Sequence, residues 1–266
     1  MFQKEKILDF KYNYFSMQIV FLSWFHKSII ASEFVGAFFI TFAACVSMFI
    51  ALRSNKFVFS YHFTHPWAIL IAPILIYLIA LFFASKGDLV VIIGNPINLF
   101  INFFKLLFNN FDLNYFKGFF SICVIQFNAM LFAVILYKAI FKKIAPQNYV
   151  RKINNNPDFT MHTFKEFATL FILCASVAVF GNWLLTNNLS LFFLNSAINA
   201  LITGLMLFFT KNKGYFTSNL NVLYGVNFIY LINKQKTWKS TLALVISTFT
   251  TIIFCAFWAL MLTLFN

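Results

Sequence analysis

Charged residues are scarce in this chain, and acidic residues are the scarcest. Only 10% of the 266 residues are charged and seven are Asp or Glu, whereas 61% are hydrophobic. A soluble domain of this length cannot bury so much apolar surface, so the composition excludes a soluble protein. The chain also lacks the acidic clusters and serine, histidine and acid groupings that an enzyme would use, and we expect no catalytic activity.

Glycine is also scarce, and closely spaced cysteines are absent from the sequence. With 8 glycines against 41 phenylalanines, the chain has no glycine-rich phosphate loop, and its helices are expected to be spaced by aromatic side chains. The four cysteines each lie in a different apolar run, at Cys45, Cys123, Cys174 and Cys255. This spacing predicts neither a disulfide framework nor a metal site, and we expect no cofactor.

Basic residues, by contrast, are present in excess. The 20 Lys and Arg residues give a formal net charge of +13, and they flank the apolar runs. Anionic lipid headgroups are therefore the expected counter-charge, and nucleic acid is not. We expect a protein that crosses the plasma membrane several times and has the lipid bilayer as its main partner.

Six long apolar runs are predicted to cross the bilayer as helices. They cover residues 32–52, 67–84, 118–141, 166–185, 189–210 and 240–265. Residues 1–31 are expected to form an amphipathic segment in the membrane interface, which is retained because no cleavage site follows a compact apolar region. A polar and basic linker, residues 142–165, divides the chain near its middle.

A shorter apolar piece, residues 95–108, is predicted to be a half-helix that begins inside the membrane. The residue before Pro96 is driven away from the helical region, while Pro96 itself suits the first position of a helix. At 1.5 Å per residue such a helix is about 20 Å long, against about 30 Å for a full crossing. A second short piece, residues 219–233, occupies the corresponding place in the second half.

The order of elements is repeated, so residues 32–141 and 166–266 are predicted to be two halves of an inverted repeat. Three spans per half place the halves in opposite orientations, and their two half-helix N-termini then meet near the midplane. The positive ends of both helix dipoles oppose cations there, whereas asparagine amides can bond to neutral hydroxylated molecules. Small neutral solutes are the predicted partners of this site.

Several short motifs in this order resemble the major intrinsic proteins, the aquaporin and glycerol-facilitator family, over roughly residues 20–265. Asn95-Pro96-Ile97 is similar to the first Asn-Pro-Ala motif, and Asn219-Leu220-Asn221 stands where the second is expected. Ser32-Glu33-Phe34-Val35-Gly36 resembles the opening of the first span, with Glu166 in the equivalent place of the second half. Gln126-Phe127-Asn128-Ala129 is similar to the third-span pattern.

This resemblance implies an all-α membrane protein of six transmembrane helices and two re-entrant half-helices, assembled as a homotetramer. It implies that the two motifs form the pore, and that Glu33, Glu166 and Gln126 support the re-entrant loops. Val222 replaces the family's arginine, so the constriction is expected to be more apolar. We therefore expect a passive channel that favours glycerol-like molecules over water.

Other interpretations of the same residues remain open. The two glutamates could relay protons, Gln126 could serve only as a contact between helices, and Asn219 and Asn221 could be simple helix caps. The chain could also be a non-conducting structural or interaction protein with the same fold, or the substrate-binding membrane subunit of a vitamin importer. In the family's orientation 13 of the 20 basic residues lie outside, which opposes the positive-inside bias.

Overall fold

The computed structural model describes residues 18–24, 26–53, 93, 96–141, 159–181, 197–198, 201, 220, 224, 228 and 238–265. Every regular element among these residues is an α-helix, as the sequence predicts. The long elements are α2 (Lys27–Arg53), α4 (Pro96–Asn109), α5 (Tyr115–Ile140), α7 (Phe159–Gly181) and α10 (Trp238–Phe265). The predicted spans at residues 67–84 and 189–210 lie almost entirely outside the described residues.

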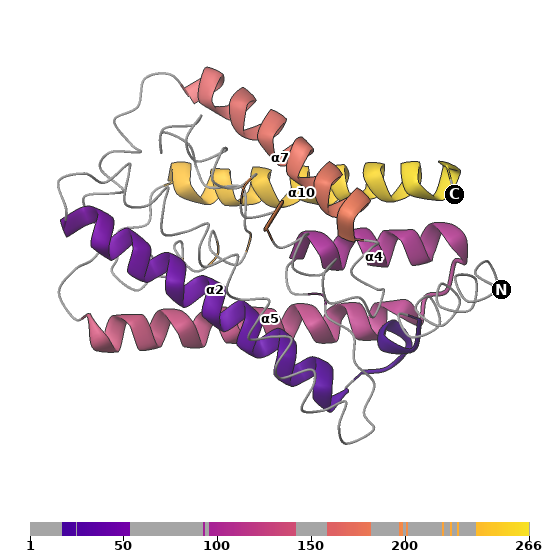
Figure 1. Cartoon of the computed structure of the whole chain (residues 1–266), viewed down its shortest axis with the longest axis horizontal. Helices are drawn as coiled ribbons and strands as arrows, with labels where there is room; N and C mark the ends of the chain where they lie inside the picture. The colour runs from indigo at the N-terminus through magenta and orange to yellow at the C-terminus, as the bar shows by residue number, and fades with distance from the viewer. Residues whose placement is uncertain are drawn as a thin grey trace.

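Three helices, α5, α4 and α10, lie side by side, with α4 in the middle (Figure 1). Helix α2 packs along α5 and crosses it, whereas α7 packs against α10 and crosses it in turn. Helix α4 also contacts α5 and α7, so it connects the two helix pairs. The shortest of the five helices is therefore the central one.

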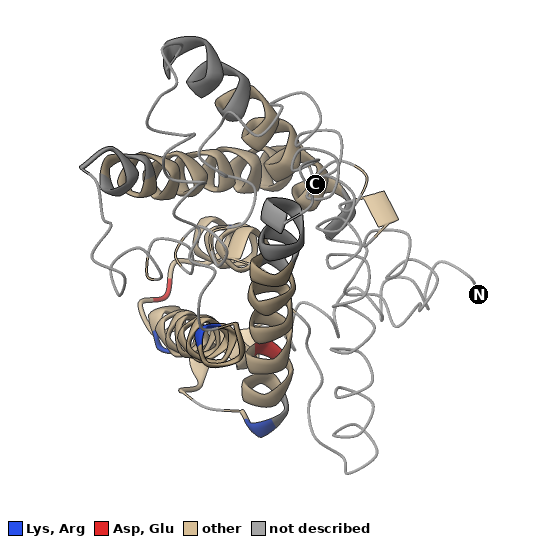
Figure 2. Cartoon of the chain, turned by 90° about the vertical axis from the view of Figure 1, so that its left-hand side faces the viewer, with Lys and Arg blue, Asp and Glu red and all other residues tan. Residues whose placement is uncertain are grey.

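Two of the described helices are long and apolar enough to cross a membrane. They are the segments Tyr115–Ile140 and Leu244–Phe265, of 26 and 22 residues. Figure 2 shows how few charged residues the described helices carry. Threonine hydroxyls in the second segment are satisfied within the helix itself, because Thr248, Thr250 and Thr251 donate to the carbonyls of residues four positions earlier.

Helix α4 has 14 residues and is about 21 Å long, which is too short to cross a bilayer. It begins at Pro96, where the missing N–H of proline costs no helical hydrogen bond. Eight of its residues are buried, from Pro96 to Leu106. After α4 the chain turns at Asp112, whose side chain accepts the backbone N–H of Asn114 just before α5 begins (2.8 Å).

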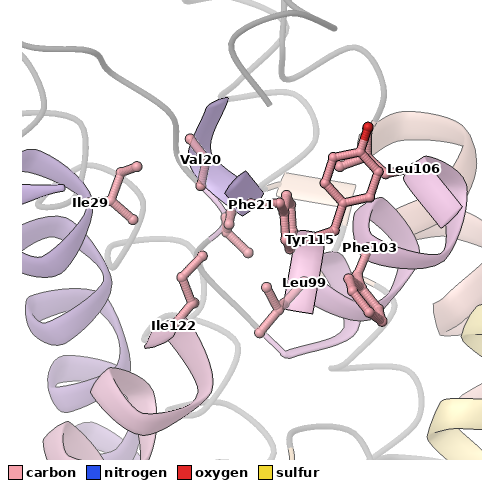
Figure 3. Packing of buried hydrophobic residues seen from close by; sticks show 9 residues of the cluster. Val20, Phe21, Ile29, Leu99, Phe103, Leu106, Tyr115 and Ile122 are labelled. Atoms are coloured by element: carbon pink, nitrogen blue, oxygen red, sulfur yellow. The ribbon is translucent and has the colours of Figure 1, made fainter. Parts of the chain in front are cut away.

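One side of α4 packs into a hydrophobic cluster that we call the α4–α5 cluster. Figure 3 shows side chains from residues 18–22, α2, α4 and α5 converging there. Its buried members are Val20, Phe21, Ile29, Ile93, Leu99, Phe103, Leu106, Tyr115 and Ile122. Phe21 is fully buried, and its ring centroid lies 6.0 Å from that of Phe103.

Gly118 allows residues 18–22 to lie directly on α5. A Cβ atom at this position would stand 2.2 Å from the carbonyl oxygen of Val20 and 2.5 Å from the Cα atom of Phe21. These neighbours are backbone atoms, which cannot rotate away. The absence of a side chain at Gly118 is therefore required by this crossing.

The helix ends differ from the predicted boundaries. Helix α2 begins at Lys27, inside the predicted segment 1–31, and α7 begins at Phe159, inside the predicted linker 142–165. Hydropathy locates only the apolar part of a helix, whereas polar residues such as Thr160 and His162 continue α7 beyond it. The sequence places Pro157 and Asp158 just before α7, a pair typical of a helix start.

Candidate functional site at the start of the short helix

The backbone of Ile93, three residues before α4, is held on both sides by buried side chains. Its N–H donates to Oε1 of Glu33 at 2.8 Å, and its carbonyl oxygen accepts from Nδ2 of Asn98, also at 2.8 Å. Ile93 is itself buried. The peptide groups of a segment that enters the protein interior outside a helix need such partners. Ile93 is thus fixed to α2 and to α4.

Glu33 also connects this segment to α5. Its second oxygen, Oε2, accepts from Nε2 of Gln126 at 2.9 Å. Both side chains are buried, at 1% and 3% exposure. A carboxyl group is costly to bury unless its oxygens have such hydrogen-bond partners.

Two asparagines extend the buried polar network along α4. Nδ2 of Asn102 lies 2.9 Å from the carbonyl oxygen of Asn98 and 3.0 Å from its Oδ1 atom. Both side chains are buried. The network therefore runs from Gln126 through Glu33 and the Ile93 peptide to Asn98 and Asn102, joining α5, α2 and α4.

Asn98 and Asn102 were not predicted as site residues. Their signal is a pair of amides four residues apart in an otherwise apolar helix, which places both on one face. Such amides need partners once they are buried. The particular acceptor for Asn98, the carbonyl of Ile93, is not evident from this spacing.

The first turn of α4 reaches the second helix pair through Ile97. This residue is buried in what we call the α7–α10 cluster, with Ile101, Leu170, Leu173, Cys174, Val177, Ala178 and Cys255. Sγ of Cys255 lies 3.8 Å from the carbonyl oxygen of Ile97. The start of α4 is thus supported by α2 and α5 on one side and by α7 and α10 on the other.

The remaining predicted site residues are only partly visible. Asn95, Asn219, Asn221 and Val222 lie outside the described residues. Glu166 belongs to α7, but its side chain is also outside the described part of the structure. Leu220 is described and is buried.

One hydrogen bond involves a residue of the second predicted half-helix. The hydroxyl of Tyr224, inside the predicted segment 219–233, lies 2.9 Å from Oγ1 of Thr248 on α10. Among the described residues, then, the structure brings Glu33 and Gln126 together and places Pro96 and Ile97 at the start of one helix. It also brings one residue of the second short segment onto α10.

The described residues contain no group of three or more His, Cys, Asp or Glu side chains that could hold a metal ion. The polar side chains that gather around Ile93 are the Glu33 carboxyl group and the amides of Gln126, Asn98 and Asn102. Comparison of the sequence with models of known protein families and with curated proteins finds no match.

Proposed function

We propose that this protein is a passive membrane channel for small uncharged solutes, with the architecture of a divergent major intrinsic protein. In this proposal six spans and two re-entrant half-helices form an inverted repeat in the plasma membrane, and four copies assemble with one pore each. The observation that carries this proposal is the start of α4, a helix of 14 residues. The backbone N–H of Ile93, three residues before this helix, is held by the buried Glu33 side chain.

The length and position of α4 support a half-helix. A short apolar helix at the centre of longer ones, beginning at a proline, suits an element that enters a bilayer and returns by the same side. Backbone outside a helix is tolerated at membrane depth only when protein side chains satisfy it. Glu33 and Asn98 do this for Ile93, because they form hydrogen bonds with its backbone N–H and its carbonyl oxygen.

The arrangement of the longer helices supports two related halves. Helix α2 crosses α5 within the first half, and α7 crosses α10 within the second (Figure 1). In the proposal α2 and α7 are the first spans of their halves, while α5 and α10 are the last. Helix α4 contacts members of both pairs, as a half-helix near the midplane would.

The proposed selectivity follows from the ends of the two half-helices. Helix N-termini present positive potential, which opposes cations, and the amides of Asn95 and Asn219 would bond to passing hydroxyl groups. Val222 in place of an arginine removes both a charge and a hydrogen-bond donor from the proposed constriction. We therefore assign glycerol-like solutes ahead of water.

Stopped-flow light scattering on reconstituted vesicles tests this function. Vesicles containing the protein should equilibrate glycerol several-fold faster than empty vesicles, with a smaller gain for water and no gain in potassium flux. Folded, inserted protein that accelerates none of glycerol, urea and water would contradict the channel and favour a non-conducting role. Co-purification with a pair of ATPase subunits would favour an importer instead.

A further inference from the structure

The four cysteines are spread along the sequence, yet two of them meet in the structure. Cys174 on α7 and Cys255 on α10 are 81 positions apart, and their sulfur atoms lie 3.9 Å from each other. Both side chains are completely buried, and all four cysteines are free thiols. The other two, Cys45 and Cys123, belong to α2 and α5.

The thiol pair belongs to the hydrophobic α7–α10 cluster. The neighbouring members of the α7–α10 cluster include Leu170, Val177 and Ala178, none of which has a polar side chain. Within the described residues, the Cys255 sulfur also lies 3.8 Å from the Ile97 carbonyl oxygen. Each sulfur therefore has the other as its principal reactive neighbour.

We propose that Cys174 and Cys255 are a site of oxidative modification, at which a small uncharged hydroperoxide converts the two thiols to a disulfide. A disulfide bond is about 2.05 Å long, so each sulfur has to move by about 1 Å from the observed separation of 3.9 Å. The oxidant must be neutral, because a charged reagent would have to enter an apolar cluster with no exposed thiol surface.

The reaction balances in two steps. One thiol sulfur attacks the hydroperoxide and cleaves its O–O bond, which gives a sulfenic acid and releases an alcohol. The second thiol sulfur then attacks the sulfenic sulfur, forming the S–S bond and releasing water. Overall, two thiols lose two electrons and two protons while the hydroperoxide is reduced to alcohol and water.

Burial and proximity have opposite effects on the rate. The oxidant must first reach sulfur atoms that have no exposed surface, so the first step should be the slower one. The second step is intramolecular and has its partner already in contact, so it should outpace further oxidation. The product would join α7 covalently to α10 and would remove the thiol proton that faces the Ile97 carbonyl.

Thiol counting and peptide mapping test this site. The protein is treated in detergent with tert-butyl hydroperoxide, denatured, alkylated with N-ethylmaleimide and analysed by mass spectrometry. Two of the four thiols should become protected, a Cys174–Cys255 linked peptide should appear, and dithiothreitol should restore all four. The thermal midpoint should rise by several degrees on oxidation and fall again on reduction.

Cys174→Ser is the control variant, since it should prevent the disulfide with Cys255 while leaving Cys45 and Cys123 free to be alkylated. If this variant does not fold, peptide mapping of the unaltered protein still decides the matter. Four alkylated thiols after treatment, sulfonic acid without a cross-link, or a link that involves Cys123 would each overturn the proposal.

Discussion

At the residue scale, Glu33 is the side chain on which the entry to α4 depends most. It accepts hydrogen bonds from a backbone group that has no helical partner and from a side chain on another helix. A buried N–H left without its acceptor costs about 1–3 kcal/mol. The backbone of Ile93 cannot rotate to find another acceptor, whereas the Gln126 amide can.

Replacing Glu33 with leucine should lower the free energy of unfolding by about 1–3 kcal/mol, because the Ile93 N–H is then buried without an acceptor. Glu33→Gln should be milder, since its amide oxygen can still accept from Ile93 while Gln126 turns its own oxygen toward the new amide nitrogen. Thermal unfolding in detergent compares the two variants. Equal stability of Glu33→Leu and the unaltered protein would remove Glu33 from this role.

Val222→Arg should narrow the range of solutes that pass. In the proposed channel this change restores a positive charge and a donor at the constriction, so glycerol and urea permeability should fall several-fold relative to water permeability. Stopped-flow measurements of all three solutes on the same vesicles give the ratio. An unchanged ratio in a conducting protein would place the constriction elsewhere.

At the element scale, the segment at residues 18–22 packs against both the short helix α4 and helix α5. Phe21 is buried beside Phe103 of α4, and the crossing at Gly118 leaves no room for a side chain. The position of residues 18–22 therefore depends on one glycine in α5.

Gly118→Ala should destabilise the protein by about 1–3 kcal/mol, because its Cβ would overlap the backbone of Val20 and Phe21. Asn128→Ala is a suitable control, since Asn128 is exposed on the same helix. The thermal midpoints of the two variants in detergent should differ by several degrees. A Gly118→Ala protein as stable as the control would mean that residues 18–22 do not lie on α5 as described.

Sequence patterns predicted part of this arrangement. The helical class follows from long apolar runs, and the position of Pro96 marks the start of α4 because proline suits the first turn of a helix. The beginning of α7 at Phe159 was not predicted, because its first residues are too polar for a search based on apolar runs.

Contacts between distant residues were harder to predict. Cys174 and Cys255 meet only because α7 packs on α10, a fact that spacing along the chain does not contain. Asn98 likewise donates a hydrogen bond to a backbone carbonyl oxygen. Every residue has such an oxygen, so the sequence does not show which one Asn98 contacts. The predicted residues Asn95, Asn219, Asn221 and Val222 lie outside the described residues and stay predictions.

At the scale of the whole molecule, the proposed channel has a defined membrane topology. Three spans in each half place both termini on one side of the membrane and residues 142–165 on the other. The excess of basic residues in the segments assigned to the outside opposes the positive-inside bias, so a direct measurement of sidedness is informative.

Single cysteines introduced by Asn13→Cys, Asn155→Cys and Asn266→Cys test this topology with a membrane-impermeant charged maleimide. In sealed vesicles of uniform orientation, the reagent should label positions 13 and 266 from one side and position 155 only from the other. The native cysteines, which lie within apolar helices, serve as the background. Labelling of all three introduced positions from the same side would exclude the inverted repeat.

The most direct test of the channel compares glycerol permeability of two matched asparagine variants. Asn95 precedes Pro96 at the proposed pore, whereas Asn128 is exposed on α5. In vesicles with equal amounts of folded protein, Asn95→Leu should bring glycerol permeability down to the level of empty vesicles, while Asn128→Leu should leave it unchanged. Equal glycerol permeability for Asn95→Leu and Asn128→Leu would contradict a pore at the start of α4.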